Sequence, residues 1–317
     1  TQSPALNRGA RDWHSDMFAE CALRNRPIVV AESMELVNPP ADFAAMFPNN
    51  QAVETAIGFG SLKSTHCNFG SGMRNYQKAV LTCIAGMQAA AGLTPEIQMG
   101  EFLWWFFTNY QVSTPTGGMA FYDAETQAAA LAALGRPLGL FRTPDDDPNG
   151  VNAGVDATFL RARLREHVLD IADTIRAAHP TAKIEVLFPY DVNYPRPAGL
   201  HYLGGRLNSF VNLPPEWSTP ATAGFDRIKT EALDFGAWSR DLNLSAEAIR
   251  LPRQLGWPKE AMRHMTPIFH PGYAWEKEVA IALSECAVVN LWAWDHICLF
   301  GYNLAPKSQT RTTLQAA

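Results

Sequence analysis

Residues 95–110 read PEIQMGEFLWWFFTNY, and this stretch decides the fold prediction. A short β-type run, Ile97–Gly100, stops at Glu101 and is followed at once by aromatic residues. A carboxylate at the carboxyl end of a buried strand is typical of barrels of parallel strands, whose active sites lie at that end. A carboxyl group beside aromatic side chains is also typical of the active sites of sugar-cleaving barrels. A strand end that closes on an apolar loop would have the same sequence, so both interpretations stay open.

Runs of helix type and strand type alternate on both sides of this stretch. Helices are predicted over Asp12–Arg24, Asn75–Ala91, Phe159–Ala178 and Trp275–Glu285, and strands over Ile28–Leu36, Ile97–Gly100, Ile184–Phe188, Phe225–Phe235, Thr266–His270 and Ala287–Trp294. A parallel pair of strands needs a crossover of a dozen or more residues, which a helix supplies. The alternation therefore predicts a parallel sheet covered by helices.

The predicted fold class is an α/β barrel of the (β/α)8 TIM-like kind, formed by residues 1–317 as a single domain. About six strands are predicted, whereas such a barrel needs roughly eight. We therefore expect the barrel to be incomplete in this chain, which opens with TQSPALNRGARDW, close to a helix and without an initiator methionine. The first strands are expected in an earlier part of a longer polypeptide or in a partner. Overlooked weak strands, for instance around Ala56–Phe59, are the alternative.

Composition and charge argue against several classes of partner. The net charge of -5 provides no basic surface for a phosphate backbone, so no nucleic acid is expected. The most apolar helix-like stretch, Ala79–Ala91, is too short to span a bilayer, so no membrane partner is expected. Thr1–Ala10 lacks the apolar core of a signal peptide, and the location, virion or cytoplasm, stays open. The five cysteines show no CxxC spacing, which argues against a zinc site or a disulfide framework.

Cleavage of a glycosidic bond needs two carboxyl groups, one as acid and one as nucleophile or base. Glu101 is the first candidate, and Glu231, in the sequence KTEALDF at the end of an alternating β-type run, is the second. Asp191 and Asp295 also end predicted strands and are alternatives for the second group. A separation of about 5 to 5.5 Å would imply retention of configuration, and roughly 6.5 to 9.5 Å would imply inversion.

Aromatic side chains offer flat faces to sugar rings, and in this chain they gather where predicted strands end. Core packing is the default interpretation of any single one, so their coincidence with strand ends is the stronger argument. Together with two polar neighbours, the residues predicted to bind a polysaccharide are Trp104, Trp105, Tyr122, Tyr190, Asn193, Trp292, Trp294 and Asp295.

Five motifs carry a family resemblance: MGEFLWWFF, GGMAFYDAETQ, IEVLFPYDVN, KTEALDF and VVNLWAWDHICLFGYN. At these motifs the chain resembles the strand ends of the large clan of retaining glycosidases with (β/α)8 barrels. It resembles still more closely a group of barrel domains in bacteriophage tail proteins, including non-contractile sheath and tail-tip components. The resemblance runs from about Ile28 to Asn303. It implies that Glu101 is the acid/base on the fourth strand and that Trp292 or Trp294 is the aromatic on the eighth.

Two positions depart from the glycosidase pattern. Gly100 stands where the clan has an Asn, whose contact with the sugar 2-hydroxyl strengthens in the transition state. The nucleophile should end the seventh strand, whereas Glu231 falls on the sixth and His270 on the seventh. The resemblance therefore implies one of two functions: a barrel that acts on or binds a polysaccharide, or a non-catalytic structural barrel that self-associates in a phage tail or another repeating assembly. Whether the chain is an enzyme stays open.

The segment Asp145–Gly150, DDDPNG, has the D-x-D-x-N-G spacing of a calcium loop, with Asp156 at the twelfth position. Oxygen donors at alternate positions suit a hard cation. The predicted ligands are Asp145, Asp147, Asn149 and Asp156. The alternative is a solvated acidic turn that caps a helix starting at Phe159. Dinucleotide and phosphate-loop motifs are absent from the sequence, so calcium is the only cofactor that it suggests.

Overall fold

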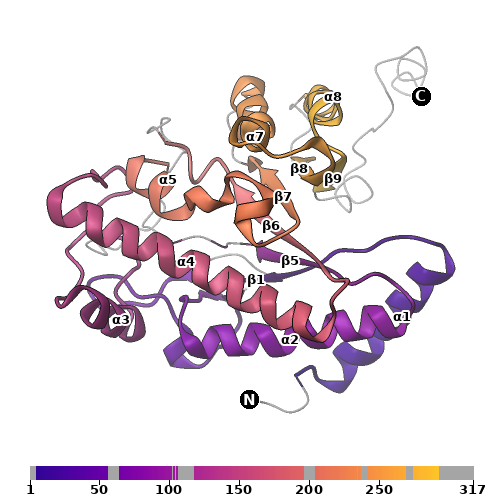
Figure 1. Ribbon diagram of the computed structural model, residues 1–317, viewed down its shortest axis with the longest axis horizontal. Coiled ribbons are helices and arrows are strands. Elements are labelled where there is room, and N and C mark those ends of the chain that lie inside the picture. Colours follow the sequence, from indigo (N-terminus) through magenta and orange to yellow (C-terminus); the bar gives the residue numbers. More distant parts are fainter. Residues whose placement is uncertain are drawn as a thin grey trace, which may run out of the picture.

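A parallel six-stranded sheet is the centre of the fold. The computed structural model describes residues 5–55, 64–101, 103, 105, 118–195, 204–233, 235–236, 241–268 and 274–292, without the side chains of Thr55 and Glu101. The strands are β1 (Val30–Ser33), β5 (Glu96–Glu101), β6 (Lys183–Pro189), β7 (Arg227–Glu231), β8 (Met262–Pro267) and β9 (Val288–Trp292), and they lie side by side in this order. The sheet curls into a half-barrel (Figure 1). The predicted fold class is therefore confirmed, with the barrel incomplete in the described residues.

Each predicted strand overlaps one strand of this sheet. Ile28–Leu36 also covers residues 35–36, which belong to a smaller sheet, and Thr266–His270 overlaps β8 only at Thr266 and Pro267. The order of the strands across the sheet follows their order along the chain, and all neighbouring pairs are parallel. Helical crossovers between successive parallel strands produce this order. The weak strand considered around Ala56–Phe59 lies outside the described residues.

Helices cover the convex side of the sheet. They are α1 (Arg8–Leu23), α2 (Ser71–Ala90), α3 (Ala124–Leu134), α4 (Val151–Ala178), α5 (Arg206–Asn212), α6 (Pro220–Ala223), α7 (Leu242–Leu255) and α8 (Trp275–Glu285). Short 3-10 turns span Ala41–Phe43, Pro215–Ser218 and Lys259–Ala261. The long helices α2 and α4 lie side by side below the sheet, whereas α7 and α8 cover its last strands (Figure 1). Within the described part of the chain, no helix is both long and apolar enough to cross a membrane.

Two helices differ from their prediction. α4 begins at Val151, well before the predicted start at Phe159, so Asp156 lies inside the helix instead of in a capping turn. α7 was not predicted, although Asp241 caps its first turn by accepting hydrogen bonds from two backbone N–H groups. Gly256 ends α7 with a φ of 113°, a conformation that glycine adopts without steric cost.

The hydrophobic core lies between the helices and the outer face of the sheet. Leu81 of α2 and Leu164 of α4 are fully buried, as are Ile97 and Ile228 on the strands. Inside this core, His167 of α4 shares a 2.6 Å hydrogen bond with the Oε1 atom of Gln77 on α2. Burial and nearby cations hold the pKa of His167 well below its usual value, so this ring is neutral.

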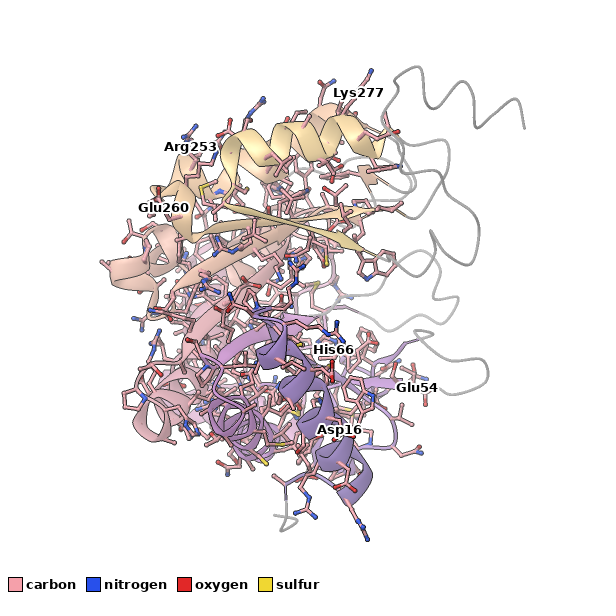
Figure 2. The ribbon with its side chains drawn as sticks, turned by 90° about the vertical axis from the view of Figure 1, so that its right-hand side faces the viewer. Asp16, Glu54, His66, Arg253, Glu260 and Lys277 are labelled. Atoms are coloured by element: carbon pink, nitrogen blue, oxygen red, sulfur yellow. The ribbon has the colours of Figure 1, made fainter. Side chains whose placement is uncertain are left out.

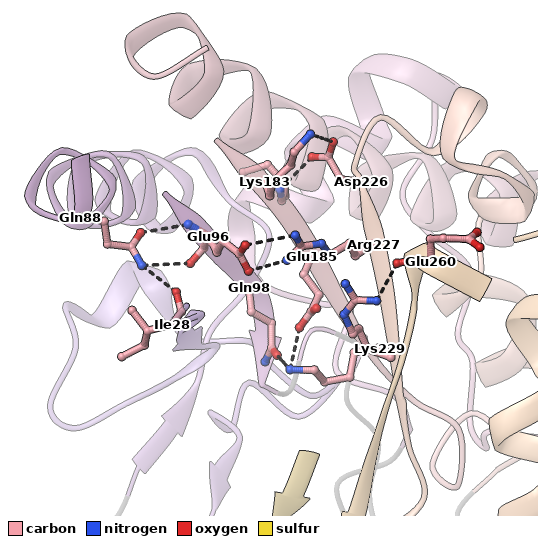
Figure 3. Close-up of polar contacts among 12 residues, drawn as sticks. Ile28, Gln88, Glu96, Gln98, Lys183, Glu185, Asp226, Arg227, Lys229 and Glu260 are labelled. Carbon is pink, nitrogen blue, oxygen red and sulfur yellow. Dashed lines mark hydrogen bonds and ion pairs between the residues drawn. The ribbon is translucent and has the colours of Figure 1, made fainter. Parts of the chain in front are cut away.

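The inner face of the sheet is charged. The guanidinium of Arg227 makes two hydrogen bonds to the carboxylate of Glu96, and Nζ of Lys229 lies 2.6 Å from Oε1 of both Glu185 and Gln98 (Figure 3). Barrel interiors are usually filled by layers of branched apolar side chains. In this half-barrel, paired charges occupy the amino-terminal part of the interior, below the strand ends.

A small antiparallel sheet lies beside β1. Its strands are β2 (Glu35–Leu36), β3 (Glu54–Thr55) and β4 (Ser64–His66), in the order β2-β4-β3. Figure 2 shows this side of the molecule, with α1, which carries Asp16, below and α8, which carries Lys277, above.

Candidate functional site

The candidate site lies at the carboxyl ends of the parallel strands. Glu101 is the last residue of β5, Glu231 is the last residue of β7, and Asp191 follows the end of β6. Because all these strands are parallel, the three residues lie at the same end of the sheet. Neighbouring strands are spaced by about 4.8 Å, so the backbones of Glu101 and Glu231, two strands apart, are separated by roughly 10 Å.

A β-bulge shapes the strand end at Glu101. The pairing register of β1 and β5 shifts there, so that Ser33 lies opposite Glu101 and Gly100 has no partner. Gly100 has a φ of 105°, and a Cβ atom added to it would lie only 2.4 Å from the Cβ of Leu103. This backbone favours glycine, which explains why Asn is missing at this position. The side chain of Glu101 lies outside the described part of the structure.

Asp191 and Glu231 are both buried at this edge, with exposed fractions of 4% and 7%. Glu231 lies in register with Pro189, the last residue of β6, and its carbonyl accepts a 2.8 Å hydrogen bond from the N–H of Tyr190. The Oδ1 atom of Asp191 accepts a 2.9 Å hydrogen bond from the N–H of Val192. The structure thus brings two of the predicted acidic residues to adjacent strand ends.

Three aromatic rings pack together beside these carboxyl groups. Tyr190, Tyr194 and Phe235 meet edge to face, with centroid distances between 5.5 and 6.2 Å. The hydroxyl of Tyr190 lies 3.5 Å from Oε2 of Glu247 on α7. Glu247 was missed because α7 was not predicted, although the N-cap Asp241 was a usable signal for this helix.

An asparagine network fastens the loops of the site. Nδ2 of Asn212, on α5, donates 2.9 Å hydrogen bonds to Oδ1 of Asn193 and of Asn208. Its Oδ1 accepts a 2.7 Å hydrogen bond from the N–H of Trp105, and Asn208 donates to the carbonyl of Val192. Asn193, predicted to bind substrate, is 1% exposed and holds the loop after β6 in place. Neither Asn208 nor Asn212 was predicted.

Trp105 is a core residue, which corrects its predicted place in a sugar-binding floor. It is 1% exposed, and its indole N–H donates to the carbonyl of Leu160 at 3.0 Å. The rings of Phe69 and Phe121 meet it edge to face at 4.5 and 5.3 Å. Trp105 therefore offers no open face to a sugar ring.

Tyr122 connects two loops through its hydroxyl group. The hydroxyl donates to the carbonyl of Gly139 at 2.9 Å and accepts from the N–H of Phe141 at 2.7 Å. Burial raises the pKa of Tyr122 to about 12. These contacts occupy the polar end of the ring, so the structure gives Tyr122 a structural task, and its predicted role in sugar binding stays a prediction.

The residues of the predicted calcium loop have partners within the chain. Asp145 accepts hydrogen bonds from Arg206, whereas Asp156 is ion-paired with Arg136 at 2.8 Å and accepts from the N–H of Gly139. Asp147 accepts from the N–H of Asn149, in a local turn. Within the described residues, which include all four predicted ligands, no group of three His, Cys, Asp or Glu side chains could hold a metal ion. Basic and backbone partners thus engage the predicted ligands separately, and calcium binding stays a prediction.

Four predicted residues remain, and only one of them lies within the described residues. Trp292 ends β9 and is half-buried. Trp104, Trp294 and Asp295 lie outside the described residues, and their predicted roles stay predictions.

One further buried carboxyl group is not among the predicted site residues. Glu32 lies on β1, and both of its carboxylate oxygens are buried without a hydrogen-bond partner. Burial raises its pKa to about 8. Its register partner on β5 is Met99, a core residue, so Glu32 faces the helices and not the inner side of the barrel.

Comparison with solved structures shows the fold. The catalytic domain of beta-amylase from Paenibacillus polymyxa is 11% identical, with a TM-score of 0.54 over 87% of this chain and 79% of that chain. The PgaB (BpsB) glycoside hydrolase domain from Bordetella bronchiseptica is 9% identical, with a TM-score of 0.56 over 89% and 76%. A beta-galactosidase from Marinomonas ef1 is 11% identical, with a TM-score of 0.54 over 89% of this chain but only 46% of its own. These identities support a shared fold alone.

Comparison with protein families is more specific. None of the curated proteins compared with the chain matches it. The family described as "Non-contractile tail sheath protein TIM barrel" matches residues 1–298. This match covers nearly the whole chain and agrees with the half-barrel of parallel strands. The chain therefore belongs to the TIM-barrel family of non-contractile tail sheath proteins.

Proposed function

We propose that the chain is a structural barrel of a non-contractile tail sheath and self-associates in a repeating assembly. The family match over residues 1–298 carries this proposal. Barrels of this fold host many unrelated functions, so membership of a specific family is a better guide than general likeness to glycoside hydrolases.

The contacts at the strand ends support a structural role. Trp105 and Asn193 are buried and hydrogen-bonded within the chain. A sugar that displaced such contacts would leave buried polar groups unpaired, which costs about 1 to 3 kcal/mol for each group. These residues therefore serve the barrel itself.

An apolar patch near the start of α4 supports self-association. Val151 and Val155 are one helical turn apart, so they share a face of α4, and they are 93% and 50% exposed. Leu140, which is 47% exposed, follows Gly139, whose N–H donates a hydrogen bond to Asp156 of α4. Exposed apolar patches mark interaction surfaces. We name Leu140, Val151 and Val155 the α4 patch.

Light scattering during gel filtration, over a range of protein concentrations, tests the proposal. We expect oligomers that grow with concentration and that electron microscopy resolves as rings or filaments. The double substitution Val151→Asp and Val155→Asp should reduce assembly, because it places two charges in the α4 patch. Ala128→Asp, at an exposed position of α3, is the matched control and should leave assembly intact. A protein that stays monomeric at all concentrations would refute the proposal.

A second candidate function is glycoside hydrolysis. It is favoured by Asp191 and Glu231, which lie buried at adjacent strand ends in a fold shared with glycoside hydrolases. If the chain cleaves a glycan, Glu101→Gln and Glu231→Gln should each abolish turnover while leaving binding intact, because each removes one of two essential carboxyl groups. Glu166→Gln, on the exposed face of α4, is the control. Reducing-end release from a panel of polysaccharides is the measurement, and no release by the unmodified protein would exclude this function.

A further inference from the structure

An apolar groove lies along α2, beside the loop that joins β2 to the 3-10 turn Ala41–Phe43. It encloses about 700 Å³, a volume typical of binding sites in proteins. Gly72, Tyr76 and Val80 of α2 line it, and because residues four apart share one face of a helix, the groove follows about 12 Å of α2. The described residues that line it carry no charge. We name it the α2 groove.

The α2 groove is already formed in the single chain. The rings of Phe43 and Tyr76, which both line it, lie 6.2 Å apart with an angle of 53° between their planes. Phe43 packs directly against the helix, since a Cβ atom added to Gly72 would lie 2.8 Å from its ring. The carbonyl of Phe43 accepts a 2.7 Å hydrogen bond from the N–H of Asn68, which holds the loop in place. Because Val37, on the opposite wall, and Tyr76 are 53% and 37% exposed, a partner would meet a preformed apolar surface, which lowers the entropic cost of binding.

α4 packs on the opposite side of α2. Gln77 of α2 shares a hydrogen bond with His167 of α4, and Lys78 of α2 forms an ion pair with the same helix. With 3.6 residues per turn, Tyr76 and Ala79, which line the groove, lie on the other side of α2. The α4 patch, at the start of α4, is therefore a separate surface from the α2 groove. Each copy of the chain thus carries two different apolar surfaces.

A repeating assembly needs two such surfaces. When a patch contacts the same patch of a second copy, the contact is satisfied in a dimer and growth stops. When two different surfaces meet, each copy binds one neighbour on either side, which produces rings or filaments. We propose that the α4 patch of one copy docks in the α2 groove of the next copy. This head-to-tail contact rests on the proposed function, self-association, and gives it a direction.

Charged residues beside the two surfaces are complementary. Leu140 and Arg142 flank the buried Phe141 and are both exposed, so Arg142 adjoins the α4 patch. Asp42 lies at one end of the α2 groove, where its Oδ2 atom is 3.6 Å from the position that a Cβ atom would take on Gly72. Within the described part of the chain, neither the guanidinium of Arg142 nor the carboxylate of Asp42 has a hydrogen-bond or ion-pair partner. Opposite charges favour contact between the two different surfaces over contact of either surface with itself.

A mixing experiment tests the direction of the contact. Val151→Asp with Val155→Asp disables the α4 patch. Val37→Asp with Asn75→Asp, at exposed positions of the α2 groove, disables the groove, because a carboxylate buried against an apolar partner costs free energy. Light scattering should show each double variant as a monomer and their equimolar mixture as a dimer that does not grow, since each pair retains one intact contact. Dimer formation also shows that both double variants are folded, and Ala128→Asp on α3 should assemble like the unmodified protein.

Exchange of the two charges tests whether they meet. Asp42→Arg and Arg142→Asp should each weaken association by about 5-fold, because like charges then face each other. Both substitutions in one chain should restore the affinity to within about 2-fold of that of the unmodified protein. Lys277→Asp, at an exposed position of α8, is the matched control and should leave the affinity unchanged. Sedimentation velocity over a range of concentrations measures these affinities, and losses that add up in the double variant would contradict the contact.

Two results of the mixing experiment would overturn the head-to-tail contact and leave self-association standing. The first is a groove variant that assembles as the unmodified protein does, which would mean that the α2 groove takes no part in assembly. The second is a mixture that stays monomeric although both double variants unfold cooperatively at the Tm of the unmodified protein. An unmodified protein that is monomeric at all concentrations would instead refute the proposed function, and the head-to-tail contact with it.

Discussion

Glu32 is the residue whose environment is least expected from its chemistry. Burial raises its pKa to about 8 from 4.5, and neither carboxylate oxygen has a partner. The folded protein keeps this proton over a pH range in which the unfolded chain releases it. The contribution of Glu32 to the free energy of unfolding is therefore highest below about pH 4.5. This contribution falls as the pH rises from 4.5 toward 8. The slope is at most about 1.4 kcal/mol per pH unit.

The substitution Glu32→Gln should remove this pH dependence, because glutamine has nearly the same size and carries no charge. In urea unfolding at pH 5, 7 and 9, we expect the variant to be more stable than the unmodified protein at pH 9. The pKa values of nearby Cys67 and Tyr76 are also raised, that of Cys67 to about 12. Both groups are present in the unmodified protein and in the variant, so the difference between the two proteins reports on Glu32. Glu166→Gln, on the surface, should follow the unmodified protein. Parallel pH profiles for the unmodified protein and the Glu32→Gln variant would contradict a raised pKa.

The positions of single residues in the fold could be predicted from the sequence in part. The acidic residues at strand ends were placed correctly along the chain, because Glu101 and Glu231 each end a strand in the structure. The sequence pattern could not distinguish aromatic residues of the core from aromatic residues that could bind a ligand. Trp105 follows a strand end as a binding residue would, yet it is 1% exposed. Its burial depends on Phe69 and Phe121, which are distant in sequence.

At the scale of elements, α5 connects the loops after β5 and β6 through Asn212. Its amide group donates two hydrogen bonds and accepts one. Buried polar networks of this kind stabilise a fold only when every member is satisfied. The network therefore determines how the strand ends are held relative to one another.

We expect Asn212→Leu to destabilise the protein by about 2 to 4 kcal/mol, because it leaves the N–H of Trp105 and two amide oxygens buried and unpaired. Urea unfolding measures the loss, and hydrogen exchange should become faster in residues 190–195. Asn152→Leu, at an exposed position of α4, is the control and should stay within about 0.5 kcal/mol of the unmodified protein. Equal stability of the two variants would show that the network is not needed.

Element types were easier to predict than their limits. The helix Trp275–Glu285 was predicted with both ends correct, and all six strands of the main sheet were found. The start of α4 was missed because an acidic, proline-containing segment, Asp145–Gly150, suggested a loop that extends further than it does. Tertiary contact of Asp156 with Arg136 stabilises the early turn of that helix.

At the scale of the whole molecule, the charged inner face distinguishes this half-barrel. Glu185 and Lys229 are 2% and 8% exposed in their side chains and lie 2.6 Å apart. Removing one partner of a buried ion pair leaves a charge without compensation, whereas replacing both with apolar residues is often neutral. Substitutions in this ion pair therefore test whether water reaches the interior of the half-barrel.

Lys229→Met should cost about 3 to 5 kcal/mol, because Glu185 would be left buried and unpaired. The double substitution Lys229→Met and Glu185→Leu should recover most of that loss. Lys183→Met breaks the more exposed ion pair with Asp226 and should cost less than about 1 kcal/mol. Thermal and urea unfolding compare the three. A single variant as stable as the double variant would mean that water already reaches the interior.

The sequence by itself determined the fold class, because alternating helix and strand runs allow few arrangements other than a parallel sheet with helical crossovers. It also determined which carboxylates end strands, since those positions depend on local pattern. Only the tertiary structure decided which of these residues meet, that Asp145 and Asp156 are paired with arginines, and that both carboxylate oxygens of Glu32 are buried without a partner. Such facts depend on contacts between residues far apart in the chain, and local sequence carries no record of those contacts.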